Sequence, residues 1–241
     1  MTIRANVIAL LTLLMTAAPL ACSTTQSPPD EPPKDKPPAF DKRKIQWSVA
    51  GTDGQGGLTV ELAFRGDDSG ESTVVLPRAL AQAEGGLQEL EVLTDEAKLL
   101  QGHKPHLRRI THSPGALVKL RYRVGEYRPP NGESPGRHMT RPVVRPDHAF
   151  FTGSALFAQP KRMHPGRERP ITFDWSALPE GWDIRTSFGT AEESAELKTA
   201  LGAVLKGTFV LGNFDTKRVD IGEMPFDVVT AGERELPAEP L

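Results

Sequence analysis

The sequence contains very little cysteine: one residue, Cys22, among 241. A single thiol excludes a disulfide within the chain and a zinc site built from several cysteines. Long apolar runs are missing after residue 22, so we expect no later segment to cross a membrane as a helix. Aromatic residues are also sparse, at 6% of the chain, whereas glycine and proline number 22 each. Such a composition favours short strands joined by turns over long helices.

Several catalytic motifs of the common enzyme classes are absent as well. The sequence has no His-Glu-x-x-His, no P-loop and no dinucleotide-binding fingerprint. Carboxylates are abundant, but no spacing singles out the pair of a glycosidase. We therefore expect neither enzyme activity nor a cofactor.

The N-terminus has the layout of a secretory signal over residues 1–21. Arg4 precedes an apolar run that is too short to span a bilayer, and small residues lead to Cys22. This segment resembles a bacterial lipobox, although Pro19 stands where leucine is usual. The resemblance implies that Cys22 is lipidated and that acyl chains anchor the protein to a membrane. The alternative is a plain secreted protein with one incidental free cysteine.

The localisation follows from this signal. Because Ser23 follows the cysteine in place of aspartate, resemblance to enterobacterial lipoproteins favours the outer membrane, facing the periplasm. A location in the cell envelope also argues against nucleic acid as a partner. We expect a lipid-anchored envelope protein whose first partner is the membrane.

Composition divides the rest of the chain into three parts. Residues 22–44 contain three Pro-Pro pairs and mixed charge, so we expect an extended tether of about 60 Å that does not fold. Residues 45–230 should form one domain, and residues 231–241 a polar tail. Strict alternation at 58–64 and again at 116–124 predicts half-buried strands. Further strands are expected at 72–77, 87–93, 106–111, 149–157, 171–175, 183–188, 208–211, 218–221 and 226–229.

Two short helices and one long loop complete the prediction. A turn or two of helix is expected at 78–84, and a better helix at 191–201, where Thr190 and Glu193 form a capping box. Five prolines within 127–146 predict a long loop. The fold class is therefore mainly β: an antiparallel β-sandwich with one or two short helices.

Charge is spread unevenly along the sequence. Residues 119–169 hold eleven Lys and Arg against four Asp and Glu, a balance of +7, and residues 171–241 hold six against thirteen, a balance of −7. The basic region could attract anionic lipid headgroups. The simpler interpretation is that these cations lie on solvated loops and partly pair with the acidic C-terminal third.

Three histidines are weak candidates for a metal site. His103 and His106 form a His-x-x-His pair, and His112 follows six residues later. No cysteine or clear carboxylate ligand accompanies them, and Pro105 prevents the helix that such a pair would need. We therefore expect no metal, and keep these three residues only as an alternative.

One ordered set of residues is more specific. Its members are Tyr122, Asp147, Phe150, Phe151, Gly153, Leu156, Phe157, Pro179, Gly181 and Trp182, with Arg185-Thr-Ser-Phe-Gly189 after them. Their order resembles the N-terminal β-domain of the glycyl aminopeptidase family of zinc metallopeptidases, although Thr152 replaces the usual asparagine. The resemblance covers 45–229 and implies the fold. Phe150, Leu156 and Phe157 are expected in the core, with Gly153 at a bulge or turn and Trp182 as a lid on a tight turn.

The resemblance carries over no zinc ligand and no general base, since the family's His-Glu-x-x-His motif has no counterpart here. We therefore expect a non-catalytic, peptidase-associated binding module that docks a separately encoded envelope peptidase or a peptide. A truncated remnant of a lipoprotein zinc aminopeptidase is the first alternative. A metal-binding envelope protein that uses His103, His106 and His112 is the second.

Overall fold

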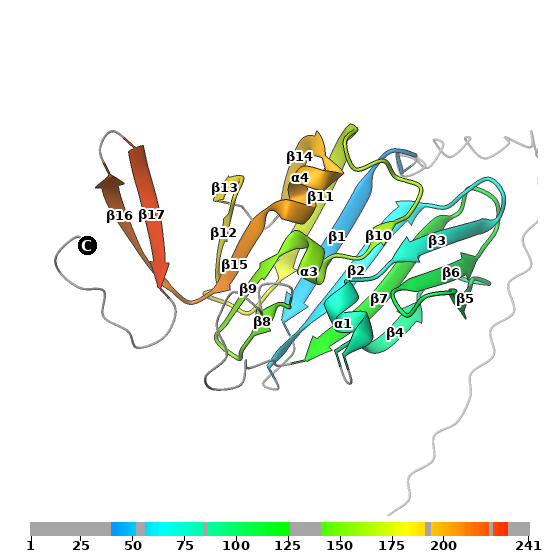
Figure 1. Ribbon diagram of the computed structural model, residues 1–241, viewed down its shortest axis with the longest axis horizontal. Coiled ribbons are helices and arrows are strands. Elements are labelled where there is room, and N and C mark those ends of the chain that lie inside the picture. The colour runs from blue at the N-terminus through cyan, green and yellow to red at the C-terminus, as the bar shows by residue number, and fades with distance from the viewer. Residues whose placement is uncertain are drawn as a thin grey trace, which may run out of the picture. The chain divides into compact units, whose positions relative to one another are not determined.

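The structure, a computed structural model, describes residues 40–51, 56–83, 86–125, 141–190, 194–221 and 224–230. Within these ranges strands dominate, and nearly all of the strand pairs are antiparallel (Figure 1). The predicted fold class is confirmed: the chain is mainly β, in an arrangement consistent with a β-sandwich. The signal at 1–21, Cys22, most of the 22–44 tether and the tail at 231–241 lie outside the described residues.

The largest sheet has six strands in the order β14-β11-β1-β2-β7-β4. Their bounds are Ser194–Ala200 for β14, Glu168–Ala177 for β11, Ile45–Gly51 for β1, Gly57–Arg65 for β2, Leu117–Gly125 for β7 and Gln88–Val92 for β4. β1 pairs with β11 in parallel, and the other neighbours are antiparallel. The parallel pair joins segments that lie more than 100 residues apart in the sequence.

Two smaller sheets and one hairpin account for the other described strands. The four-stranded sheet consists of β10 (Gln159–Pro160), β3 (Glu71–Val75), β6 (Leu107–Thr111) and β5 (Lys98–Gln101), in that order. The five-stranded sheet consists of β13 (Gly189–Thr190), β12 (Asp183–Thr186), β15 (Thr208–Gly212), β9 (His148–Thr152) and β8 (Val143–Val144). β16 (Asp215–Ile221) and β17 (Met224–Thr230) pair with each other.

The described helices are all short. They are α1 (Arg78–Gln82), α3 (Gly153–Leu156) and α4 (Leu201–Lys206). Each begins at a residue whose side chain makes no capping hydrogen bond. Such short segments are not stable alone, so the packing of Leu80, Leu156 and Leu201 into the core holds them in place. In the described part of the chain, no helix is long and apolar enough to span a bilayer.

Alternation of side chains explains how the large sheet buries one face. In β2 and β7, residues two apart along each strand are fully buried, and the residues between them are more exposed, apart from the small Ala63. The buried set is Leu58, Val60, Leu62, Phe64, Val118, Leu120, Tyr122 and Val124. These side chains join residues of the two smaller sheets in one hydrophobic core. Each fully buried large apolar side chain stabilises the fold by about 1.5–3 kcal/mol.

The predicted helix at 191–201 is wrong. Residues 194–200 form strand β14, which pairs antiparallel with β11 from Ser194 to Ala200. Ala195 and Leu197 lie two apart and face the same side, as a strand requires. Helix begins only at Leu201, as α4. The pairing with β11 outweighs the local preference for helix, which is a matter of a few tenths of a kcal/mol per residue.

Other elements differ from the prediction in part, and two of them lie around β9. The strand expected at 149–157 ends at Thr152, because the chain turns there into α3. The loop expected at 127–146 contains the short strand β8 at Val143–Val144, which pairs with β9. Residues 127–140 of that loop lie outside the described residues.

Candidate functional site

Tyr122 is a fully buried residue of β7 that holds the chain on either side of Phe157. Its hydroxyl donates a hydrogen bond to the carbonyl oxygen of Leu156 at 2.6 Å and accepts one from the backbone N–H of Ala158 at 3.0 Å. The indole N–H of Trp47 donates to the carbonyl oxygen of Ala158 at 2.9 Å. Burial raises the pKa of the Tyr122 phenol far above its ordinary value. These three bonds form what we call the Tyr122 clamp, whose role is structural.

The clamp places Phe157 at the centre of an aromatic cluster. Phe157 stacks on Trp47, with ring centroids 4.8 Å apart, and meets Phe151 and Phe209 edge to face at 5.7 Å and 5.2 Å. Phe157 and Leu156 lie in the core, as predicted. Phe150 does not: it is 37% exposed, because Phe151 takes the inward position and neighbouring residues of a strand point to opposite faces.

Gly153 and Asp147 also have structural surroundings. Gly153 opens α3, and a Cβ atom there would lie 2.2 Å from the carbonyl oxygen of Val204, so only glycine allows this approach of α3 to α4. The carboxylate of Asp147 lies 2.9 Å from Nδ1 of His148. The backbone carbonyl of Asp147 accepts a hydrogen bond from Asn213.

The segment Pro179–Trp182 forms the predicted tight turn. The N–H of Trp182 donates to the carbonyl of Pro179 at 3.1 Å, and Gly181 has φ +81°, a conformation that favours glycine. Trp182 is partly buried and packs against the core. Pro179 sits so close to the end of β1 that a side chain at Gly51 would collide with its ring.

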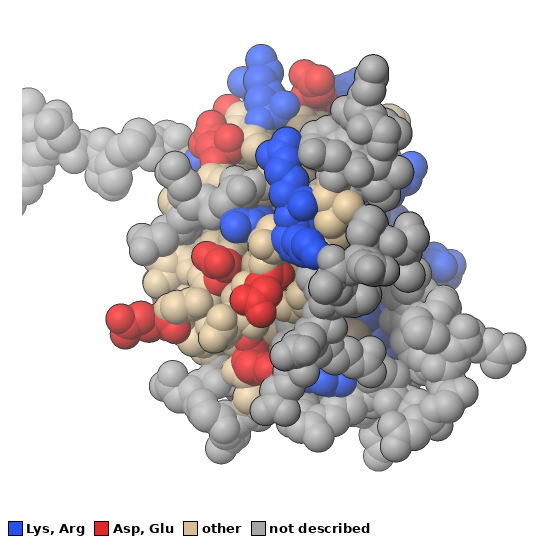
Figure 2. Space-filling view, turned by 90° about the vertical axis from the view of Figure 1, so that its left-hand side faces the viewer, with Lys and Arg blue, Asp and Glu red and all other residues tan. Residues whose placement is uncertain are grey.

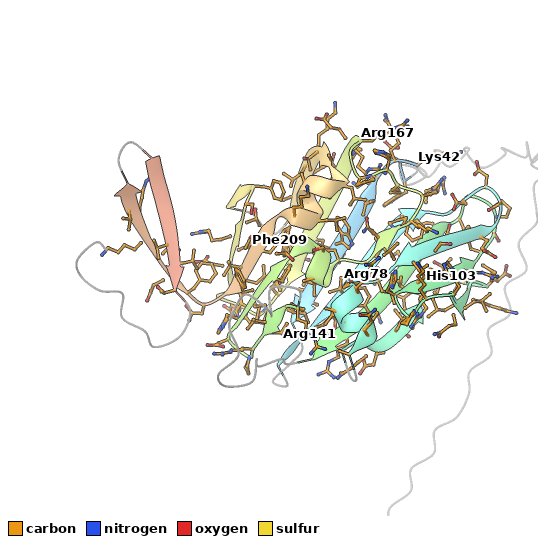
Figure 3. The ribbon with its side chains drawn as sticks, viewed as in Figure 1. Lys42, Arg78, His103, Arg141, Arg167 and Phe209 are labelled. Carbon is orange, nitrogen blue, oxygen red and sulfur yellow. The ribbon has the colours of Figure 1, made fainter. Side chains whose placement is uncertain are left out.

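The aromatic cluster opens to the surface at one end, in a small cleft of about 40 Å³. We call it the aromatic cleft; it is lined by Phe173, Trp175, Thr186, Phe188, Ala195, Leu197 and Phe209. Phe209 is labelled in Figure 3. The indole N–H of Trp175 is buried there and has no hydrogen-bond partner in the structure. Such an orphaned donor destabilises the unbound protein by about 1–3 kcal/mol.

Phe188 forms the exposed rim of the aromatic cleft, on the turn between β12 and β13. It is 38% exposed, and its backbone N–H donates to Oγ1 of Thr186 at 3.0 Å. The preceding Ser187 exchanges hydrogen bonds with Thr208 of β15, at 2.9 Å and 2.8 Å. The ring packs on Gly207, where any Cβ would lie 2.8 Å from it. The exposed ring is therefore held in place before any partner arrives.

Sequence reasoning placed Phe188 in the resembling segment but did not identify the aromatic cleft. The available signal was an aromatic residue in a turn, directly before Gly189 with φ +105°. Trp175 and Leu197 could not be connected with it, because the pairing of β11 with β14 brings them together.

The three candidate histidines do not converge on one point. His112 uses both ring nitrogens: Nδ1 donates to the carbonyl of Ser113 at 2.8 Å, and Nε2 accepts from the hydroxyl of Ser72 at 2.9 Å. His106 is buried, its Nδ1 has no partner, and burial foremost lowers its pKa. His103 is exposed. No group of three metal-binding side chains occurs among the residues that the structure describes.

The Ser72–His112 pair lacks the surroundings of a catalytic dyad. Ser72 is 2% exposed, so a substrate cannot reach its hydroxyl. The other nitrogen of His112 is bonded to a backbone carbonyl, where a triad places a carboxylate. Gly66 packs directly on the imidazole. The pair joins Ser72 of β3 to the residue that follows β6.

The cations of β7 lie on the outer face of the large sheet and pair across strands. Lys119 and Arg121 both approach the carboxylate of Glu61, and Arg121 also approaches Glu91. The partners of these two cations therefore come from the N-terminal half of the chain. Surface pairs of this kind are worth little individually. Figure 2 shows another side of the molecule, on which Lys and Arg side chains form a row beside Asp and Glu, among the residues described there.

A shallow hollow on this outer face offers no unused chemical group. Small side chains of Ser48, Ala50 and Ala177 make room for it. The carboxylate of Asp174 at its edge accepts hydrogen bonds from Ser176 and Ser48, and the bond from Ser176 is the main reason that its pKa is lowered. The structure therefore favours the aromatic cleft as the candidate functional site.

Comparison with known proteins gives one kind of match. No protein-family model matches the sequence, and no curated protein matches it either. Among solved structures, the fold is similar to an aminopeptidase N family protein from Idiomarina loihiensis, with a TM-score of 0.60 at 14% sequence identity. The match covers 78% of this chain and 32% of that one. This chain therefore spans about a third of its structural neighbour, and at this identity the similarity shows the fold alone.

Proposed function

We propose that the chain is a non-catalytic β-sandwich module that binds a peptidase of the aminopeptidase N type in the cell envelope. The observation that carries the proposal is the structural match, which pairs most of this chain with about a third of a peptidase-family protein. In that protein the similar part shares a polypeptide with the other two thirds. Here the equivalent interaction would be made between separate chains.

The aromatic cleft is the surface that we assign to this interaction. It combines a rigidly held, exposed phenylalanine with an orphaned indole N–H, and interface hot spots commonly consist of aromatic anchors beside a few polar groups. Strand β14 next to it is an edge of the six-stranded sheet, so its outer backbone groups are open to a partner strand. The occupant is an apolar segment of the peptidase, which packs on the exposed ring of Phe188.

Lipidation of Cys22 is the second part of the proposal. Its support is the layout of residues 1–21 and the single cysteine at the position that a lipobox requires. Anchored by acyl chains, the module would hold the peptidase at the membrane. Mass spectrometry of the mature N-terminus tests this part: a diacylglyceryl group on Cys22 supports it, and an unmodified thiol overturns it.

The docking part is tested by site-specific photocrosslinking in cells of the source organism. A photoreactive phenylalanine analogue replaces Phe188 in one strain and Leu100 in another. Leu100 is the matched control, because it is apolar, equally exposed at 38%, and lies on the edge strand β5 of a different sheet. We expect an adduct from position 188, identified by mass spectrometry as a metallopeptidase, and none from position 100. Equal adducts from both positions, or no peptidase, would contradict the assignment.

Absence of catalysis is a separate measurement. The purified full-length chain is incubated with a panel of aminoacyl aminocoumarins, with and without added zinc. We expect release of the fluorophore at the rate of the blank. Hydrolysis in proportion to the amount of chain would show that it is an enzyme.

A further inference from the structure

A basic hollow of about 260 Å³ lies between the first described residues and the segment that leads into β11. Its basic lining consists of Lys42, Arg43, Arg162, His164, Arg167 and Arg169. Lys42 and Arg167, both labelled in Figure 3, lie at the same end of the domain. Cations from two distant parts of the sequence therefore surround one space.

Three of these cations already have carboxylate partners. Arg43 pairs with Asp41 at 3.4 Å, and Lys42 pairs loosely with Asp68 at 3.9 Å. The guanidinium of Arg162 is fixed by Asp67 at 2.7 Å and by a hydrogen bond to the carbonyl of Arg65 at 2.6 Å. These residues shape the hollow but have part of their charge compensated.

Arg167 and Arg169 differ from them, since neither makes an ion pair with any residue that the structure describes. Arg169 is only 8% exposed. Its Nη2 donates to the carbonyl of His164 at 3.0 Å, but its buried Nε has no hydrogen-bond partner. Burial, followed by the charges of Arg162 and Arg167, lowers the pKa of Arg169.

A buried cation without a counterion lowers the stability of the folded protein, because the protein interior solvates a charge less well than water does. Proteins compensate such a group with an anion, and the described carboxylates do not supply one to Arg169. Glu168 also lines the hollow, but residues 168 and 169 point to opposite faces of β11 and Glu168 is exposed. The hollow is therefore lined by two guanidinium groups, the exposed one of Arg167 and the buried one of Arg169, that have no ion-pair partner among the described residues.

We propose that this hollow binds a phosphate group, with Arg167 and Arg169 as its main ligands and Lys42 at the rim. Guanidinium groups present forked N–H donors that match the oxygens of phosphate, and donors from two chain segments suit a tetrahedral anion better than a planar carboxylate. The same phosphate chemistry occurs in lipid headgroups and in soluble compounds, and the vesicle experiment below distinguishes these two sources. Lys42 follows Cys22 by twenty residues, so an extended tether of about 70 Å or less separates the hollow from an acylated cysteine.

Thermal unfolding of the full-length chain with inorganic phosphate tests the site itself. Against chloride at equal ionic strength, we expect a saturable rise in Tm of about 3–6 °C at ten times the Kd. Arg167→Gln should weaken the apparent affinity about tenfold or more. Arg109→Gln is the matched control, since Arg109 is an exposed arginine on β6 that pairs with Glu71 away from the hollow. It should leave the phosphate response unchanged.

Arg169→Gln supplies a second readout. It should abolish the phosphate response and, because it removes an uncompensated buried charge, should not lower Tm when phosphate is absent. A phosphate response that is missing in the wild type, or equal in wild type and Arg167→Gln, would overturn the proposal.

Vesicles distinguish the two sources of phosphate. The full-length chain carrying Cys22→Ser, so that no acyl group contributes, is sedimented with phosphatidylglycerol or phosphatidylcholine vesicles. Binding to phosphatidylglycerol that falls in Arg167→Gln, but not in Arg109→Gln, identifies a lipid headgroup. A saturable response to inorganic phosphate without such vesicle binding identifies a soluble phosphate compound. The proposed docking to a peptidase is independent of either outcome.

Discussion

Replacing Tyr122 with phenylalanine removes one buried hydroxyl and leaves the aromatic ring in place. The substitution deletes two hydrogen bonds of the Tyr122 clamp, so the carbonyl of Leu156 and the N–H of Ala158 both lose a partner. Each buried backbone group left without a partner costs about 1–3 kcal/mol. We expect the free energy of unfolding to fall by about 3 kcal/mol, which corresponds to about 6–12 °C in Tm for a domain of this size.

Urea denaturation followed by tryptophan fluorescence measures this change. The m-value should stay constant, since the same surface is exposed on unfolding, and only the midpoint should move. Ser69→Ala is the control, because it removes an exposed hydroxyl that donates to the backbone of Glu71 and should change stability by less than about 0.5 kcal/mol. A loss below about 0.5 kcal/mol in Tyr122→Phe would refute the clamp as a stabilising element.

A double-mutant cycle with Trp47→Phe tests whether the clamp acts as a unit. Trp47 and Tyr122 both bond to Ala158, one at its carbonyl and the other at its N–H. We expect a coupling energy of about 0.5–3 kcal/mol between the two substitutions. Strictly additive losses would mean that the two bonds stabilise the fold independently.

Further predictions concern pH and glycine. Because burial raises the pKa of Tyr122, the unfolded chain loses a proton above about pH 10 that the folded chain keeps. The free energy of unfolding should therefore fall as the pH rises above about 10, and it should fall less in Tyr122→Phe. Urea midpoints measured from pH 8 to 11 test this. Because the pKa of His106 is lowered in the folded chain, the unfolded chain binds a proton below about pH 6.5 that the folded chain does not bind. The free energy of unfolding should therefore fall as the pH falls from 7 to 5, and the slope should be shallower in His106→Leu. A slope equal to wild type in either variant would refute that assignment. Gly153→Ala should lower the free energy of unfolding by more than about 2 kcal/mol, since its Cβ meets the backbone of Val204. The Cβ of Gly181→Ala meets no atom, so this substitution should cost only about 1–2 kcal/mol for the positive φ. Equal melting curves for the two variants would contradict this.

Strand prediction from the sequence succeeded where burial is one-sided. Leu58 to Phe64 alternates because β2 presents one face to the core and the other to solvent. Helix prediction at 191–201 failed because the deciding interaction is non-local: that segment pairs with β11, whose residues lie 20 to 32 positions earlier in the sequence. Phe150 and Phe151 show another limit, since adjacent aromatics point to opposite faces and the sequence alone does not say which one is buried.

The candidate surfaces were only partly visible in the sequence. The resembling segment led to the Tyr122 clamp and to Phe188, but the aromatic cleft depends on how β11, β14 and β15 lie together. The basic hollow depends likewise on Lys42 meeting Arg167 across more than 120 residues. Charge counting found the basic region at 119–169, yet only the structure separates its paired cations on β7 from the unpaired ones near β11.

Aminopeptidase activity that co-purifies with the chain tests the central claim most directly. The full-length chain with an affinity tag is isolated from detergent-solubilised envelopes of the source organism. Three versions are compared: wild type, Phe188→Ala and Leu100→Ala. The hydrolysis of aminoacyl aminocoumarins is measured per mole of tagged chain. We expect activity with wild type and Leu100→Ala, and a loss of about tenfold or more with Phe188→Ala, since an aromatic anchor that becomes buried in an interface contributes about 2 kcal/mol or more. Activity at the level of the blank in the wild type, or activity that Phe188→Ala leaves unchanged, would contradict it.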